Sequence, residues 1–357
     1  MDITIPKAAL SRIAKRLQTI SDAKSGLVAF SHTLLSAESG QLFACAGNRF
    51  ARLETFVPAT VAKEGGVMVP TKSLLSALKA LAGQEVRLRV NGSFMLTLDE
   101  LDADRQLKVQ GCQPADLQPL QWTGPSIELK TSDVATLIGC TEHAISTDET
   151  RAHIAHALFA RDDSGLRMVA TDGCRLAMHS LPAISEAPWF SLHINTRGLS
   201  ELKRTCVEQS PALLDMCIQP HQVAFTLPET ALVIERTCSV FPPYWSVIPK
   251  SSYHNARVSK KALLAAIKAV VNMRQKADAL DLQLSDGRLC VSGSCGNSRI
   301  ETVATGISPS IRLCAKFVYE AVSAAPQDAI ELEFNGETDP MVIRASSYLA
   351  LVMPMGR

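Results

Sequence analysis

The chain has 357 residues, 46% of them apolar and 20% charged, with a formal net charge of +1. These values are typical of a globular protein long enough for several domains, and they exclude a low-complexity or disordered chain. No apolar run approaches the ~18 residues of a membrane-spanning helix, and the first residues lack the basic-then-apolar pattern of an export signal. We therefore expect a cytoplasmic protein whose ten cysteines are free thiols.

Two sequence blocks recur in each third of the chain. The first is a short alternating strand leading into a helix, and its copies contain Ile5, Leu129 and Val258. The second carries an arginine, at Arg49, Arg175 and Arg299, with spacings of 126 and 124 residues. Two blocks that repeat at one period predict three domains of one fold. The expected domains are residues 1–122, 123–249 and 250–357.

Each third contains two helix candidates, both entered from a strand. The six helices are expected at residues 6–19, 71–81, 131–145, 197–204, 259–274 and 315–325. Aligned on the entering strand, Lys72, Arg197 and Lys316 occupy one position. The linkers are expected at Gln118–Pro125 and Pro249–Asn255.

Alternating strands follow the helices and end at turn dipeptides, which supply the positive φ of tight hairpins. The dipeptides are Asn91-Gly92, Asp286-Gly287 and Asn335-Gly336. The unit is therefore a strand, a helix and further strands, repeated six times. This pattern predicts an α+β fold with antiparallel sheets, in which each domain consists of two half-copies and the helices cover one face.

Charge is distributed unevenly between the predicted helices and the rest of the chain. The six helical segments hold fourteen basic and four acidic residues, a net +10, which leaves −9 elsewhere. Basic helices and acidic strands favour a helical layer that faces a polyanion; the alternative is a set of ordinary solvated helix faces. Aromatic residues make up only 5%, so sequence-independent contact with a duplex backbone is favoured over base stacking.

The chain lacks the common catalytic motifs, including Gly-x-Ser-x-Gly, Gly-x-Gly-x-x-Gly, the phosphate-loop lysine motif and His-Glu-x-x-His. Cys140, His143, His153 and His156 could supply a zinc shell. However, His153 and His156 are expected on a strand, where their odd spacing points them to opposite faces. We expect no catalysis, no metal and no cofactor.

Three segments carry a family resemblance: Thr171–Ala177 (Thr-Asp-Gly-Cys-Arg-Leu-Ala), Phe241–Pro249 (Phe-Pro-Pro-Tyr-Trp-Ser-Val-Ile-Pro) and Leu351–Met355 (Leu-Val-Met-Pro-Met). In this order, and over the whole chain, the sequence resembles the bacterial replicative sliding clamp, the β subunit of DNA polymerase III. The resemblance implies three clamp domains and a head-to-tail homodimeric ring. Twelve helices packed about 10 Å apart would enclose a hole of ~28 Å, wide enough for a duplex of roughly 20 Å.

The resemblance also implies functional residues and partners. Duplex DNA would contact Lys24, Arg151 and Arg197. Helix placement adds Arg12, Lys15, Lys72, Lys203 and Lys261. A replicative DNA polymerase, a clamp loader and other proteins with clamp-binding motifs would use a peptide pocket between the second and third domains. The pocket residues would be Ile154, Thr171, Gly173, Cys174, Arg175, Leu176, Pro242, Val247, Phe317, Met353, Pro354 and Met355. The dimer seam would join Leu107 and Val109 to Val271 and Met273.

The sequence departs from the family pattern around this pocket. Cys174 stands where histidine is usual, Pro243 replaces an aspartate, and Ser246 replaces a basic residue. Gly356-Arg357 ends the chain in place of arginine and an apolar residue. These changes favour a diverged or accessory clamp with an altered partner set. A clamp-fold scaffold that has lost DNA encirclement is the other alternative, although the basic helices disfavour it.

Overall fold

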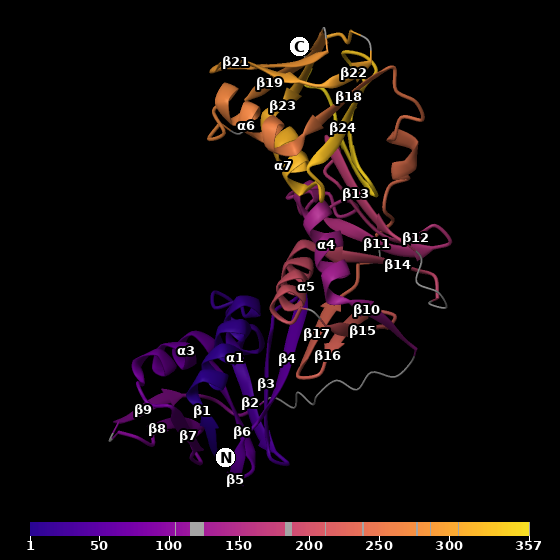
Figure 1. Ribbon diagram of the computed structural model, residues 1–357. Helices are drawn as coiled ribbons and strands as arrows, with labels where there is room; N and C mark the ends of the chain where they lie inside the picture. Colours follow the sequence, from indigo (N-terminus) through magenta and orange to yellow (C-terminus); the bar gives the residue numbers. More distant parts are fainter. Residues whose placement is uncertain are drawn as a thin grey trace. The chain divides into compact units, whose positions relative to one another are not determined.

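The computed structural model describes residues 1–103, 105–114, 125–182, 188–210, 212–237, 239–275, 278–285, 287–305 and 307–356. The chain forms two compact units (Figure 1). Unit 1 comprises Met1–Thr131 and Ser200–Arg236, and unit 2 comprises Ser132–Leu199 and Thr237–Arg357. Each unit contains two sheets, and every strand pair among the described residues is antiparallel.

Unit 1 contains a five-stranded and an eight-stranded sheet. The first has the order β5-β1-β7-β8-β9, with β5 Thr60–Lys63, β1 Asp2–Pro6, β7 Glu85–Val90, β8 Met95–Glu100 and β9 Arg105–Gln110. The second has the order β10-β15-β16-β17-β4-β3-β2-β6. Its strands are β10 Ser126–Lys130, β15 Leu213–Ile218, β16 Gln222–Leu227, β17 Thr230–Glu235, β4 Ala51–Pro58, β3 Gln41–Gly47, β2 His32–Glu38 and β6 Gly65–Pro70. The β17–β4 ladder joins segments far apart in the chain.

Unit 2 contains a nine-stranded sheet of order β14-β11-β12-β13-β26-β25-β24-β18-β22. Its strands are β14 Phe190–Asn195, β11 His156–Asp162, β12 Gly165–Thr171, β13 Arg175–Leu181, β26 Tyr348–Val352, β25 Met341–Ala345, β24 Ala329–Phe334, β18 His254–Ser259 and β22 Val303–Thr305. A four-stranded sheet has the order β21-β20-β19-β23. Its strands are β21 Gly296–Glu301, β20 Arg288–Gly293, β19 Ala279–Ser285 and β23 Ile311–Cys314.

Six longer helices each follow a strand, as the sequence predicts. They are α1 Lys7–Ile20, α3 Thr71–Ala80, α4 Thr131–Thr141, α5 Thr196–Glu208, α6 Lys260–Val270 and α7 Ala315–Ala324; α2 Val28–Ser31 is a single turn. Helices α1 and α3 lie side by side within unit 1, and α6 and α7 within unit 2 (Figure 1). The α+β fold is confirmed.

Apolar spacing explains why α1 forms and which face it buries. Leu10, Ile13, Leu17 and Ile20 recur at helical spacing and are all buried, and each contributes about 1.5–3 kcal/mol of hydrophobic stabilisation. Pro6 precedes the helix with φ −58°. Because proline fixes φ near this value and lacks an N–H, it is tolerated at a helix start. The opposite face of α1 is left to solvent.

The turn prediction is only partly correct. Gly287 has a positive φ of +70°, as predicted, whereas Asp286 lies outside the described residues. At Asn91-Gly92 the positive φ falls on Phe94, at +58°. The reason is that the Asn91 carboxamide oxygen accepts from the backbone N–H groups of Ser93 and Met95, which widens the turn.

Other predicted boundaries shift by a few residues. The turn after β24 spans residues 335–340, so Asn335-Gly336 does not form a two-residue hairpin. Helix α5 continues to Glu208, whereas α4 ends at Thr141 and is followed by a 3₁₀ turn, Glu142–Ala144. Of the predicted linker Gln118–Pro125, residues 118–124 lie outside the described residues. The three-domain division stays a prediction.

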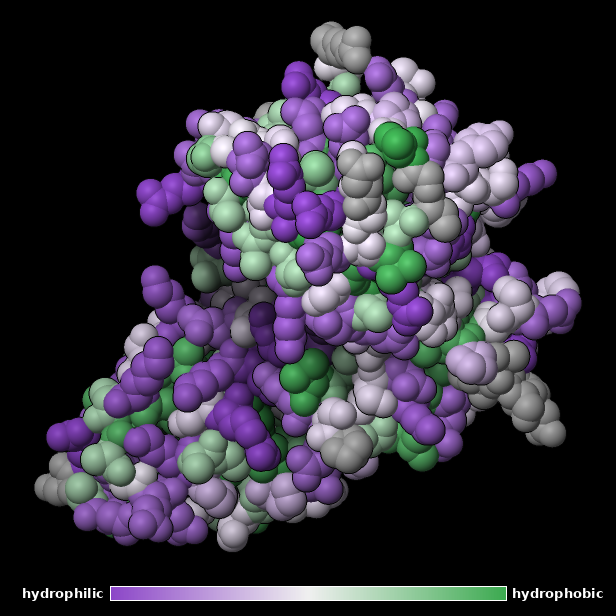
Figure 2. Space-filling model, turned by 45° about the horizontal axis from the view of Figure 1, so that its top comes forward, coloured by the Kyte–Doolittle hydropathy of each residue, from purple (hydrophilic) through white to green (hydrophobic). Residues whose placement is uncertain are grey.

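Surface chemistry is mixed. On the face drawn in Figure 2, apolar side chains form small groups separated by polar ones. Within the described part of the chain, no helix is long and apolar enough to cross a membrane.

Candidate functional site

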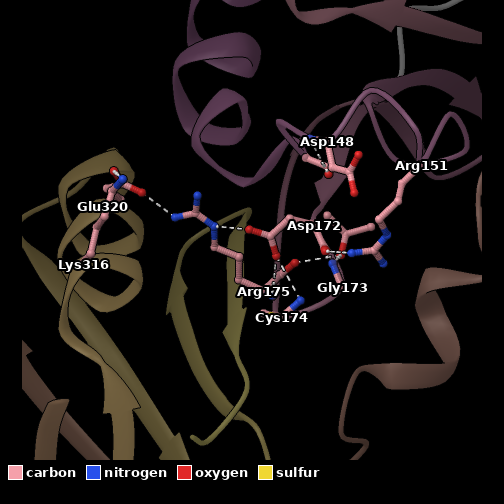
Figure 3. A network of polar contacts seen from close by, with 10 residues as sticks. Asp148, Arg151, Asp172, Gly173, Cys174, Arg175, Lys316 and Glu320 are labelled. Carbon is pink, nitrogen blue, oxygen red and sulfur yellow. Dashed lines mark hydrogen bonds and ion pairs between the residues drawn. The ribbon is translucent and has the colours of Figure 1, made fainter. Parts of the chain in front are cut away.

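A tight turn between β12 and β13 forms the centre of the predicted pocket (Figure 3). The Thr171 hydroxyl donates to the Arg175 carbonyl oxygen over 2.7 Å. One Asp172 carboxylate oxygen accepts from the backbone N–H groups of Cys174, at 2.9 Å, and Arg175, at 3.0 Å. Gly173 has a φ of +91°, a conformation that glycine adopts without strain. The sequence Thr-Asp-Gly-Cys-Arg therefore specifies this turn locally.

The Arg175 side chain links this turn to helix α7 (Figure 3). Its Nε donates to Asp172 over 2.9 Å, and its Nη1 donates to Glu320. Its guanidinium carbon also lies 4.2 Å from the centre of the Phe317 ring, a cation–π contact. The Arg175 side chain is only 10% exposed. The positive charge of Arg175 is therefore neutralised by partners within unit 2, and the residue holds the turn in position.

His143 lies on the 3₁₀ turn that contacts β12, β13 and α7. Burial, together with the positive charge of Arg175, lowers the pKa of His143 to about 4. The imidazole is therefore neutral at neutral pH, because protonation would place two positive charges in one poorly hydrated region.

Apolar side chains form the floor beside the turn. Leu176 is buried and pairs with Leu351 on β26. Both belong to a core cluster with Leu158, Val169, Tyr244, Val342 and Leu349, against which Phe241 and Ile248 pack. The segment from Phe241 to Ile248, which contains Pro242 and Val247, thus lies on this cluster. Val247 remains 52% exposed.

The C-terminal segment reaches the same turn. The Met353 N–H donates to the Cys174 carbonyl oxygen over 2.9 Å, and the Met355 N–H donates to Arg312 over 2.8 Å. Pro354 forms an isolated bridge with Leu313. Cys174 and the 40%-exposed Met353 are therefore adjacent at the surface. We call Cys174, Pro242, Val247 and Met353 the candidate peptide surface.

The structure brings most of the twelve predicted pocket residues together within unit 2, in three layers. Cys174, Val247 and Met353 are exposed, Arg175 and Phe317 support the turn, and Leu176 forms the floor. Ile154 is only 2% exposed, and its carbonyl oxygen accepts from Ser146, so it contributes to the core. The sequence analysis did not predict the contacts made by Tyr244 and Trp245. The signal that could have indicated them is the pair of aromatic residues between prolines.

Several predicted DNA-facing cations are exposed at one helical position. Lys72, Arg197 and Lys261 are each the second residue of their helices, α3, α5 and α6, and each is exposed. Lys316 holds the same position in α7. No acidic residue occupies the first turn of these four helices. A cation at the positive end of a helix dipole lowers helix stability by about 0.3–1 kcal/mol. A contribution to helix stability therefore does not explain why a cation recurs at this position.

The other predicted cations lie in different surroundings. Arg12 and Lys15 are exposed on α1, Lys24 is exposed in the loop after it, and Lys203 is half-buried on α5. Arg151 is exposed in the loop before β11, and its Nη1 donates to the Asp172 carbonyl oxygen over 2.9 Å. Arg151 therefore belongs to the turn of Figure 3 rather than to a helix.

Part of the helical charge is neutralised. Arg16 pairs with Glu208 at 3.0 Å and is only 16% exposed, and Arg204 pairs with Glu201 at 3.0 Å. Within their observed bounds the six helices hold thirteen basic and four acidic residues, a net +9. The basic excess is therefore close to the predicted value, but not all of it is available to a partner.

The predicted seam residues lie near two sheet edges. Strand β9, which carries Leu107 and Val109, is an edge of the five-stranded sheet, and β21 is an edge of the four-stranded sheet. Leu107 and Met273 are half-buried. Val271 is only 4% exposed, and its side chain fills the space where a Gly293 Cβ would lie.

The argument used against a zinc site placed His153 on a strand, and that placement is wrong. Strand β11 begins at His156, and His153 lies in the exposed turn before it, because the loop is closed by the Ile154 and Ala155 N–H groups, which donate to Arg151. Among the described residues, no group of three His, Cys, Asp or Glu side chains could hold a metal ion.

Known proteins share this architecture. The sliding clamp of Bacillus subtilis superposes with a TM-score of 0.91 at 20% identity, covering 100% of this chain and 99% of that one. A putative DNA polymerase III β subunit from Eubacterium rectale gives 0.92 at 16% identity, covering 100% of both chains. The fold is therefore that of the bacterial sliding clamps.

Sequence comparison agrees. Residues 128–240 match the family described as DNA polymerase III beta subunit, central domain. The beta sliding clamp of Treponema pallidum is 25% identical over 367 residues, covering 98% of this chain and 97% of that protein. That of Caulobacter vibrioides is 25% identical over 299 residues, covering 82% and 80%. In sequence, therefore, the chain is similar to the bacterial DNA polymerase III β subunits.

Proposed function

We propose that this protein is a sliding clamp, a non-catalytic processivity factor. Two copies form a head-to-tail ring around duplex DNA and hold it without sequence specificity. A peptide surface on each copy tethers a DNA polymerase and other replication or repair proteins. The topological link keeps these enzymes on their template.

The repeated cation at the second helical position carries this proposal. Lys72, Arg197 and Lys261 lie on three separate helices and are exposed. Each places a positive charge at the positive end of a helix dipole. The N-terminus of a helix favours anions, so a lysine or arginine there adds to the attraction for a phosphate. Loose contacts with phosphates carry no sequence information, which suits a protein that must slide.

Two further features support the proposed ring and the proposed binding of partner proteins. Among the described residues, β9 and β21 each lie at the edge of a sheet with no strand on one side. Pairing between copies would remove both edges. The candidate peptide surface combines an exposed methionine with an apolar floor. Methionine adapts to different apolar partners, which suits a surface that several proteins use in turn.

Charge reversal tests the DNA contact. The triple variant K72E/R197E/K261E should weaken binding to duplex DNA at least tenfold and flatten its salt dependence, since each lost phosphate contact removes about one unit of slope. The matched control is K63E/K130E/R288E, which makes the same charge change at exposed strand positions. Equal losses in the two variants would mean that only net charge matters, and would contradict the helical DNA surface.

A further inference from the structure

The segment that supplies Pro242 and Val247 to the candidate peptide surface also presents a large, exposed aromatic side chain. Trp245 is 67% exposed, whereas the preceding Tyr244 is only 8% exposed. The Tyr244 and Trp245 ring centres are 5.2 Å apart in an edge-to-face arrangement, and Tyr244 makes a similar contact with Phe241 at 6.2 Å. The Trp245 ring therefore packs against Tyr244, which belongs to the core cluster.

The backbone that carries Trp245 is held firmly. Pro242 and Pro243 restrict φ before it. The Tyr244 N–H donates to Pro242 over 2.7 Å, and the Ser246 N–H and hydroxyl both donate to Pro243, over 3.1 and 2.7 Å. Arg167, whose positive charge acts on the Tyr244 hydroxyl, pairs with Asp162. A ring fixed in this way can bind a partner with little loss of conformational entropy.

The charges around this ring point to an uncharged partner group. The stretch Phe241–Pro249 contains no charged residue. In the neighbouring turn, Arg175 is engaged by Asp172 and Glu320, and Arg151 donates to the Asp172 carbonyl oxygen. Trp245 also shares its single helical turn with Val247, which is 52% exposed. Trp245 and Val247 therefore present two exposed apolar side chains on the segment that packs against the floor of the candidate peptide surface.

We propose that Trp245 determines partner specificity, by selecting peptides that place an aromatic side chain against its ring. This inference rests on the proposed peptide surface and adds a requirement to it. An aromatic pair adds roughly 0.5–1.5 kcal/mol beyond area burial, equivalent to roughly three- to tenfold in affinity. Because no ion pair is involved, the affinity should be nearly independent of salt.

A selection experiment tests this requirement. A random 12-residue peptide library is displayed and selected on the full-length protein, on W245A and on W189A. Trp189 is a matched control, since it is 66% exposed and lies outside the Phe241–Pro249 segment. Wild type and W189A should select peptides with an aromatic residue at one fixed position. W245A should lose this enrichment and bind the same peptides roughly three- to tenfold more weakly, and W245F should restore binding.

The outcomes separate the two proposals. If W245A selects the same peptides with the same affinity, Trp245 is not a specificity determinant. Enrichment of lysine or arginine at that position, with affinity that falls in salt, would also overturn an aromatic partner in favour of a cation. A further variant, M353K, tests the peptide surface itself. Peptides that bind M353K as tightly as wild type would contradict the proposed surface, whatever the result at Trp245.

Discussion

Arg175 illustrates how much a single residue depends on partners distant in sequence. The Thr-Asp-Gly-Cys-Arg motif predicts the turn and the bond to Asp172, because both are local. It does not predict Glu320, which is 145 residues away and is brought close only by the packing of α7. The sequence therefore predicts Arg175 as a pocket residue, whereas its burial and ion pairs are properties of the folded unit.

Removing Arg175 should destabilise the protein. R175A leaves Asp172 and Glu320 without their shared cation in a largely buried site, which should lower the free energy of unfolding by about 2–3 kcal/mol. Urea denaturation measures this change. R312A is the control, since Arg312 is 54% exposed in its pair with Asp281 and should cost less than about 1 kcal/mol. Similar losses for the two variants would refute the structural role of Arg175.

His143 should make stability sensitive to mild acid. Its pKa is about 4 in the folded protein and 6.5 ordinarily, so below pH 6.5 the unfolded chain binds a proton that the folded chain excludes. Stability should therefore be constant above this value and fall by about 1–2 kcal/mol between pH 6.5 and 5. Urea denaturation across this range measures the effect. H143Q should make this fall smaller and leave the part due to His156 and His179, whose pKa values burial also lowers. H153Q, at an exposed site, should not change it; an unchanged H143Q profile would disprove the assignment.

At the scale of elements, helical periodicity predicts all six longer helices, since each buries one apolar stripe. The strand that enters each helix is also predicted, and together they place Lys72, Arg197 and Lys261 at equivalent positions. The ends of the helices are less predictable. Helix α5 runs on to Glu208, where the carboxylate pairs with Arg16, and this contact with α1 has no local pattern in the sequence.

Substitutions near the sheet edges should affect assembly. L107D on β9 and M273D after α6 each place a carboxylate at the proposed seam, and should convert a dimer to a monomer at micromolar concentration because a buried unpaired charge is costly. Sedimentation velocity measures the oligomeric state. L213D serves as a control, since Leu213 is 51% exposed on β15. A dimer that survives both seam substitutions would place the interface elsewhere.

At the scale of the whole molecule, the period of the repeat predicts three equivalent thirds, but the compact units divide differently. Strand β4 of the first third pairs with β17 of the second, and β13 of the second pairs with β26 of the last. Two sheets therefore run across the predicted boundaries. Local patterns specify each strand, but they do not specify which distant strand completes its ladder, because that choice depends on how whole half-copies pack.

The central claim is that binding is topological. It is tested most directly on a linear duplex with one end fixed to a bead. Protein is added while the other end is free, that end is then capped with a bulky antibody, and the bead is washed in high salt. A ring that has threaded onto the DNA should stay bound after capping and leave when a restriction enzyme cuts the duplex. Capping before adding protein should prevent retention. Two results would contradict encirclement. One is retention of the protein whether the end is capped before or after protein is added, and the other is no retention under either order.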